Sequence, residues 1–142
     1  MKEVSLKLLG AVPPAPSPLE AAALANKQGV DAAKHAFIAS CGEDNLTSCM
    51  DADRFNAWGY NLLGQQRSKD ALAVFELNAW AHPKSANAQD SLADGYLSVE
   101  DKENAKEAVQ RAIALAPSDQ TLDAAAKSSF LSEENAKLQT IK

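Results

Sequence analysis

The two cysteines are the residues of this sequence best suited to covalent chemistry. Cys41 and Cys49 flank the polar stretch GEDNLTS, which contains no histidine that could complete a zinc site. In an oxidising compartment the two thiols are expected to form a local disulfide, whereas in a reducing cytosol they stay free. The sequence leaves both states open. Localisation follows from them: periplasmic or secreted if the cysteines pair, cytoplasmic if they do not.

The stretch DADRFN (51–56) begins like a calcium-binding loop. Its sixth position is Asn56, where such a loop needs glycine, and its twelfth is Leu62, where the loop needs glutamate. The metal interpretation therefore fails. Asp51 and Asp53 are better explained as charges at the start of a helix.

The two histidines give no sign of catalysis. His82 directly precedes Pro83 at the end of an expected helix, where a cation near the last carbonyl groups is favourable. His35 falls in a different repeat unit of the chain, so the two form no pair. Neither a Ser-x-x-Lys motif, nor a Gly-x-Ser-x-Gly motif, nor a glycine-rich phosphate loop occurs in the sequence. We therefore expect a non-enzyme without cofactor or metal.

Composition and charge narrow the classes of partner. A chain of 142 residues suits one compact domain. Abundant alanine and few β-branched residues favour helix over strand. The net charge of −5 argues against nucleic acid, because phosphate binding needs clustered lysine and arginine. No apolar run approaches the roughly 18 residues of a membrane span.

A repeat with a period of 34 residues organises the middle of the chain. Equivalent positions align without a gap: Trp58 with Leu92, Leu62 with Tyr96, Ala71 with Ala105, Phe75 with Val109, and Pro83 with Pro117. This period and a helix–turn–helix plan are typical of the tetratricopeptide repeat. The small residues let paired helices approach, and the proline ends the second helix. We predict an all-α tetratricopeptide-repeat solenoid of antiparallel helix pairs with a C-terminal capping helix.

The repeat register divides the chain into segments. We interpret residues 1–18 as a linker or truncated upstream element, because PPAPSP is typical of an extended linker. The repeat domain covers 19–131. It comprises a degenerate repeat at about 19–51 that includes the cysteine loop, full repeats at 52–85 and 86–119, and a cap at 120–131. Residues 132–142 are expected to form a tail or a short helix.

Residues 19–119 also resemble a narrower group, the tetratricopeptide tails that follow bacterial serine-hydrolase domains of the β-lactamase-like esterase class. The segments that carry this resemblance are Gly59-Tyr60, Leu62-Leu63, VFELNAWAHPKSAN (74–87), Asp90-Ser91-Leu92 and the leading GVDAAKHAF (29–37). VSLKLLGAVPPAPSPLE (4–20) looks like the exit from a preceding enzyme domain. Gln89, where such tails often carry an aromatic residue, and the cysteine loop depart from the pattern.

The resemblance implies a non-catalytic protein-interaction or scaffolding module, the C-terminal repeat domain of a larger bacterial enzyme. Its partner is then a protein or peptide, such as the upstream catalytic domain. The alternative is a structural or oligomerisation accessory that sets the quaternary state or stability of an esterase-like enzyme, with a second copy of the chain as partner.

In this family the first helices of the repeats line a binding groove. The register carries the groove positions onto Asp53, Asn56, Tyr60 and Leu63 in the first copy, and onto Asn87, Asp90, Asp94 and Leu97 in the second. The set is acidic and amide-rich, whereas repeats that grip the acidic tails of chaperones use lysine and arginine there. We therefore expect a neutral or basic ligand. A groove that is simply solvated is the alternative.

Leu77 and Trp80 form a candidate docking patch. They lie three residues apart on one face of the second helix, whereas the equivalent positions one repeat later are Arg111 and Ala114. One interpretation packs Trp80 on the degenerate repeat, near Phe37. The other is an exposed apolar patch that docks a catalytic domain or a second copy of the chain.

Overall fold

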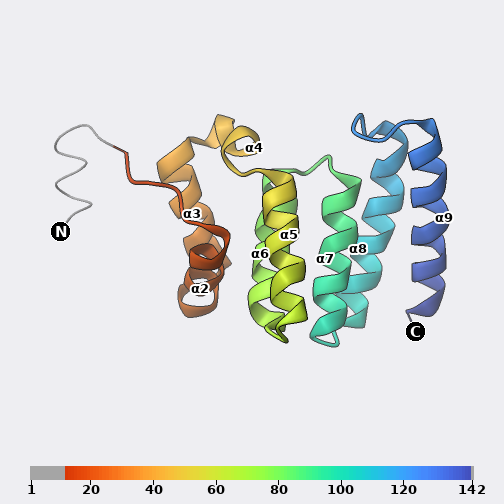
Figure 1. Cartoon of the computed structure of the whole chain (residues 1–142), viewed down its shortest axis with the longest axis horizontal. Helices are drawn as coiled ribbons and strands as arrows, with labels where there is room; N and C mark the ends of the chain where they lie inside the picture. The colour runs from red at the N-terminus through yellow and green to blue at the C-terminus, as the bar shows by residue number, and fades with distance from the viewer. Residues whose placement is uncertain (1–11, 142) are drawn as a thin grey trace.

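The computed structural model describes residues 12–141, and every regular element in this range is helical (Figure 1). The long helices are α2 (Pro18–Gln28), α3 (Val30–Cys41), α5 (Ala52–Gly64), α6 (Ser68–Ala81), α7 (Ala86–Ser98), α8 (Lys102–Leu115) and α9 (Ala124–Thr140). Short elements are η1 (Glu43–Asn45), α4 (Leu46–Cys49) and η2 (Ala116–Ser118). The all-α prediction is confirmed for this part of the chain. Most of the predicted upstream element, residues 1–11, lies outside it.

The central helices follow the 34-residue period. α7 begins and ends 34 residues after α5, and α8 begins and ends 34 residues after α6. The turns repeat as well, since Gln66 (φ 61°) and Glu100 (φ 62°) adopt the same left-handed conformation. The helix pairs α5–α6 and α7–α8 are therefore two copies of one unit, and Figure 1 shows the helices ranked in chain order towards α9.

Side-chain caps set where several helices begin. Asp51 accepts a hydrogen bond from the Arg54 amide at the start of α5 (3.0 Å), as the charge at that position predicted. Ser85 caps α7 and Asp101 caps α8 in the same way. Each such cap contributes about 1 kcal/mol to stability.

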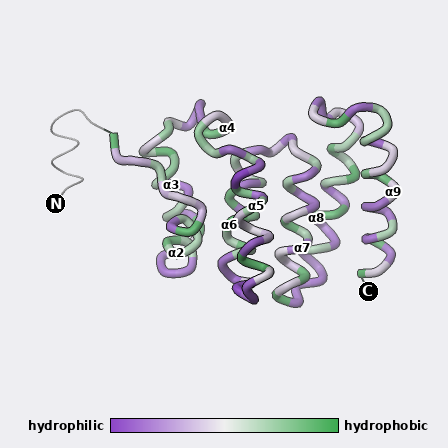
Figure 2. The backbone as a smooth tube through the Cα atoms, viewed as in Figure 1, coloured by the Kyte–Doolittle hydropathy of each residue, from purple (hydrophilic) through white to green (hydrophobic). Residues whose placement is uncertain are grey.

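The core lies between the helices of successive pairs, and Phe75 of α6 is at its centre. Its side chain is fully buried, and the ring of Tyr60 meets it edge-on at 5.0 Å. Gly59 of α5 and Gly95 of α7 face the same ring, where a Cβ atom at Gly95 would come within 2.9 Å. Of the positions that the repeat aligns on the helices, Trp58 and Tyr96 pack at the margin of the core. The others are buried, namely Leu62, Ala71, Phe75, Leu92, Ala105 and Val109. Figure 2 shows hydrophobic and hydrophilic residues alternating along the helices, as expected when one face of each is buried.

Replacing Gly59 with alanine should destabilise the protein by about 1–2 kcal/mol. The new methyl group would overlap the Phe75 ring, and overpacking of this kind typically costs about 1–3 kcal/mol, partly offset by the better helix propensity of alanine. Gly64, in the same helix, has open space around its Cα atom. Gly64→Ala should therefore be neutral or stabilising. Urea denaturation followed by circular dichroism compares the two variants, and equal effects would contradict the close packing at Gly59.

The leading hairpin α2–α3 exists but packs differently from the two later units. The second helix of the first full repeat, α6, packs on the first helix of the following repeat, α7. In the leading hairpin it is the first helix, α2, and not the second, α3, that makes the more extensive contact with α6. Asn26 of α2 donates a hydrogen bond to Asp70 of α6 (2.6 Å). The α3–α5 contact includes the rings of Phe37 and Phe55, 5.7 Å apart. The extra residues of the cysteine loop, folded as η1 and α4, separate α3 from α5 in the chain.

The C-terminal helix is longer than the sequence suggested. The sequence predicts a boundary between residues 131 and 132, but α9 continues from Ala124 to Thr140 without a break. Neither glycine nor proline occurs in this stretch to end the helix. Its second half also carries the buried Glu134, so the cap extends well past residue 131.

Candidate functional site

A network of polar side chains links α5, α7 and α9. Its members, which we call the acidic cluster, are Tyr60, Asp90, Asp94, Glu134 and Lys137. The Tyr60 hydroxyl donates to Asp94 (2.5 Å), and Lys137 Nζ donates to Asp94 (3.0 Å) and to Asp90. The first helices of the two repeats and the capping helix thus meet at one charged centre.

The 34-residue repeat explains why Tyr60, Asp90 and Asp94, the members of the cluster on α5 and α7, lie together. Tyr60 and Asp94 are 34 residues apart, so they occupy the same position in successive copies. Asp90 and Asp94, four residues apart, share a face of α7. A second contact between the copies lies one turn away, where Ser91 donates to Asn56. Hydrogen bonds therefore connect α5 and α7 at positions of the predicted groove.

Glu134 is the unusual member of the cluster. The residue is 2% exposed, its Oε2 atom lies 4.0 Å from Lys137 Nζ, and its Oε1 atom has no hydrogen-bond partner among residues 12–141. Burial, then the neighbouring Asp90 carboxylate, raise the pKa of Glu134 to about 8, although Lys137 opposes the shift. At neutral pH the folded protein therefore holds Glu134 mostly in its neutral form.

Tyr60 and Lys137 also keep their protons. Burial and the hydrogen bond to Asp94 raise the pKa of Tyr60, so its hydroxyl remains a donor. Burial alone would lower the pKa of Lys137, but its bonds to Asp90 and Asp94 more than compensate and raise it. The site is thus a set of carboxyl groups arranged around one cation. Because Asp90 and Asp94 already hold the Lys137 ammonium group, the arrangement can bind a cation.

The structure brings together half of the predicted groove. Asn56, Tyr60, Asp90 and Asp94 make the contacts described above. Leu63 and Leu97 are partly buried against the core, and Asp53 and Asn87 are exposed in the first turns of their helices. Sequence reasoning missed Ser91, Glu134 and Lys137. The repeat alignment could have identified Ser91, because it lies next to the groove position Asp90. The two α9 residues match no repeat position.

The predicted exposed pair at Leu77 and Trp80 is not present. Leu77 is fully buried, and Trp80 is partly buried with Lys34 Nζ 5.7 Å from its ring centroid. Both α2 and α3 pack against α6. The docking-patch interpretation, which needs Leu77 and Trp80 exposed on α6, therefore does not agree with the structure. The other interpretation, in which Trp80 packs on the leading hairpin, agrees with these contacts.

Cys41 and Cys49 form a disulfide in the structure, with their Cα atoms 5.9 Å apart. The loop that they close is tied to the end of α6. Thr47 Oγ1 donates to the Ala81 carbonyl (3.1 Å), and His82 Nε2 lies 2.5 Å from the Met50 carbonyl. Because a carbonyl only accepts, the His82 Nε2 atom must carry the proton. His82 therefore has a structural partner.

Loss of the disulfide should lower stability by up to about 2–3 kcal/mol, because the closed loop is short. The native protein should show no mass increase on alkylation without reductant and two added groups after reduction and unfolding. The Cys41→Ser/Cys49→Ser variant should give the lower denaturation midpoint. Two reactive thiols in freshly purified protein would refute the pairing.

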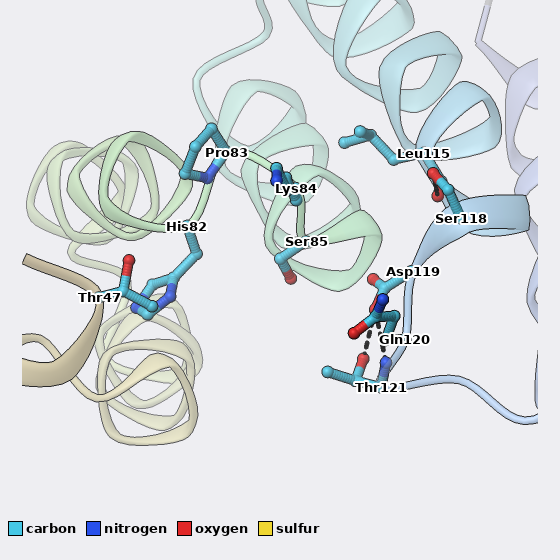
Figure 3. A pocket seen from close by; sticks show the side chains of 10 residues that line it. All are labelled: Thr47, His82, Pro83, Lys84, Ser85, Leu115, Ser118, Asp119, Gln120 and Thr121. Atoms are coloured by element: carbon cyan, nitrogen blue, oxygen red, sulfur yellow. Dashed lines mark hydrogen bonds between the residues drawn. The ribbon is translucent and has the colours of Figure 1, made fainter.

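A cavity of about 670 Å³ adjoins this loop (Figure 3). It lies between α4, the α6–α7 turn and the segment that follows η2. Asp119, on its wall, already accepts hydrogen bonds from the Ala86 amide (2.9 Å) and from the amide and hydroxyl of Thr121 (2.9 and 2.6 Å). Thr47 and His82 are also engaged, so the acidic cluster is the stronger candidate site.

Two further observations concern the chain as a whole. No helix in residues 12–141 is long and apolar enough to cross a membrane. A scan against models of known protein families finds no match, and a search of curated proteins finds no similar sequence.

Proposed function

We propose that this chain is a non-catalytic interaction module of the tetratricopeptide type, which binds a polypeptide segment carrying positive charge. The groove formed by α5 and α7 is the binding surface. The acidic cluster is the observation that carries the proposal, because it already holds one cation, Lys137, between two carboxylates.

The repeat positions support the assignment to this family. In the family pattern the first helix carries three large residues, with a glycine directly after the second of them. The second helix carries an alanine and a phenylalanine, and a proline follows it. In the first copy these positions hold Phe55, Trp58, Gly59, Leu62, Ala71, Phe75 and Pro83. Gly59 and Phe75 meet in the core, as the pattern requires.

Charge decides the class of ligand. The groove carries Asp53, Asp90 and Asp94, and the chain as a whole has a net charge of −5. Such a surface repels acidic peptides and favours lysine and arginine side chains. A basic segment of a catalytic domain in the same polypeptide, as the sequence resemblance implies, is one ligand of this kind. The structural or oligomerisation alternative stays a second proposal, but the buried Leu77 cannot form its docking surface.

Labelled glycine–serine peptides that carry spaced arginines or spaced glutamates test the proposal. Fluorescence anisotropy should show binding of the arginine peptide that weakens as salt rises. The Asp90→Asn/Asp94→Asn variant should bind it roughly fivefold to tenfold more weakly. Asp44→Asn, at an exposed loop position, is the matched control and should bind as the wild type does. Preference for the glutamate peptide would overturn the proposal.

A further inference from the structure

We propose that Lys137 occupies, in the unbound chain, the subsite that receives a lysine or arginine side chain of the partner, so that partner binding displaces Lys137. This inference rests on the proposed function, because it names the part of the groove that recognises the ligand's charge. The C-terminal helix then acts as an internal competitor for the groove.

The position of Lys137 supports this role. It belongs to α9, the capping helix, but its ammonium group reaches across to Asp90 and Asp94 on α7, which are predicted groove residues. Its side chain is 22% exposed, so the subsite opens to solvent. Tyr60 completes the wall from α5 by its bond to Asp94. A cation from a bound peptide would meet the same acceptors.

Lys137 does not satisfy the whole site. The buried Glu134 carboxyl group points towards it, but the Oε2 atom is 4.0 Å from Nζ, and Oε1 has no hydrogen-bond partner among residues 12–141. Three carboxyl groups therefore surround a single ammonium group. A guanidinium group offers five donors in a planar fork and can bond two carboxylates at once. The unpartnered oxygen is buried, so a ligand group with more donors than lysine would reach it only after Lys137 has left.

The first experiment asks whether an external cation fills the subsite. Lys137→Ala removes the ammonium group and three methylene groups, and n-propylammonium has the same atoms. In sodium chloride this variant should melt below the wild type, and n-propylammonium chloride at equal concentration should restore about half of the loss or more. Lys127→Ala is the matched control, because Lys127 is also on α9 but bonds the Pro117 carbonyl (2.9 Å) outside the cluster. It should show no restoration.

The second experiment measures competition and does not need the alanine variant to fold. Lys137→Gln keeps a hydrogen-bonding side chain but loses the charge. It should bind the peptide acetyl-Gly-Gly-Arg-Gly-Gly-amide about tenfold more tightly than the wild type, because the groove is no longer occupied by its own cation. The glutamine analogue of the peptide should show no such gain.

The outcomes separate this inference from the proposed function. Equal affinity of the wild type and Lys137→Gln for the arginine peptide leaves peptide binding intact and overturns self-occupancy. If neither protein binds the peptide but n-propylammonium still restores Lys137→Ala, the cation subsite stands and the proposed function fails. No restoration in a folded Lys137→Ala variant overturns the subsite itself.

Discussion

Replacing Phe75 with alanine should lower the free energy of unfolding by about 3–5 kcal/mol. The side chain is fully buried between the two repeats and fills the space above Gly59 and Gly95. Neither glycine has a side chain that could move into the resulting cavity. Chemical denaturation of the wild type and of the variant measures the difference. Phe130→Ala is the matched control, because Phe130 is only partly buried on α9 and should cost less.

A double-mutant cycle of Phe75→Ala and Gly59→Ala tests the contact between these two residues more sharply. In the Phe75→Ala background the ring that Gly59→Ala would overlap is gone. The penalty of Gly59→Ala should then vanish or reverse, so the two substitutions should be strongly non-additive. Additive effects would show that the two residues do not meet, and the described packing of α5 on α6 would be wrong.

Stability should fall as pH rises from about 4.5 to about 8, by roughly 2–4 kcal/mol, because of Glu134. Its pKa is about 8 in the folded protein against an ordinary value of 4.5. In this interval the folded state holds a proton that the unfolded state has released, so rising pH favours unfolding. The contribution is fully present below the lower value and is lost above the higher one. The charged groups that face Glu134 are Asp90, Asp94 and Lys137.

Glu134→Gln should remove most of this pH dependence and become the more stable protein at alkaline pH. Burial also raises the pKa of Glu76, which leaves a smaller slope of the same sign. Glu133→Gln is the matched control, because Glu133 is the exposed neighbour in the same helix and should retain the wild-type profile. Denaturation midpoints of the wild type and both variants, measured across the pH range, test whether Glu134 causes the pH dependence. A profile for Glu134→Gln that parallels the wild type would contradict the assignment.

The helices of the two central repeats were predictable because their signals are local and repeated. Alanine and phenylalanine at fixed spacing mark the faces that pack, and Ser85 and Asp101 are typical capping residues at the helix starts that they cap in the structure. The sequence left two interpretations of the pair Leu77 and Trp80 open, because the exposure of these residues depends on how the leading hairpin packs against α6. Nothing in the local pattern of α6 determines that packing.

The α9 half of the candidate site could not be predicted from the repeat. In a third copy of the repeat, Ser128 would take the position of Asp94, and the first helix would begin at residue 120. Instead α9 begins four residues later, at Ala124. Its extra length brings Lys137 to Asp94 instead. A buried carboxyl group such as Glu134 also runs against the usual exposure of glutamate, so composition gave no hint of it.

The most direct test of the central claim, an acidic groove that binds cationic polypeptide segments, is a nuclear magnetic resonance titration of the isotope-labelled protein. Arginine and glutamate versions of the same peptide serve as probes. The account predicts that the arginine peptide shifts the backbone amide signals around Tyr60, Asp90 and Asp94 in a salt-sensitive manner, and that the glutamate peptide does not. Tight, salt-sensitive binding of the glutamate peptide, or shifts confined to the cavity beside Thr47 and His82, would contradict it.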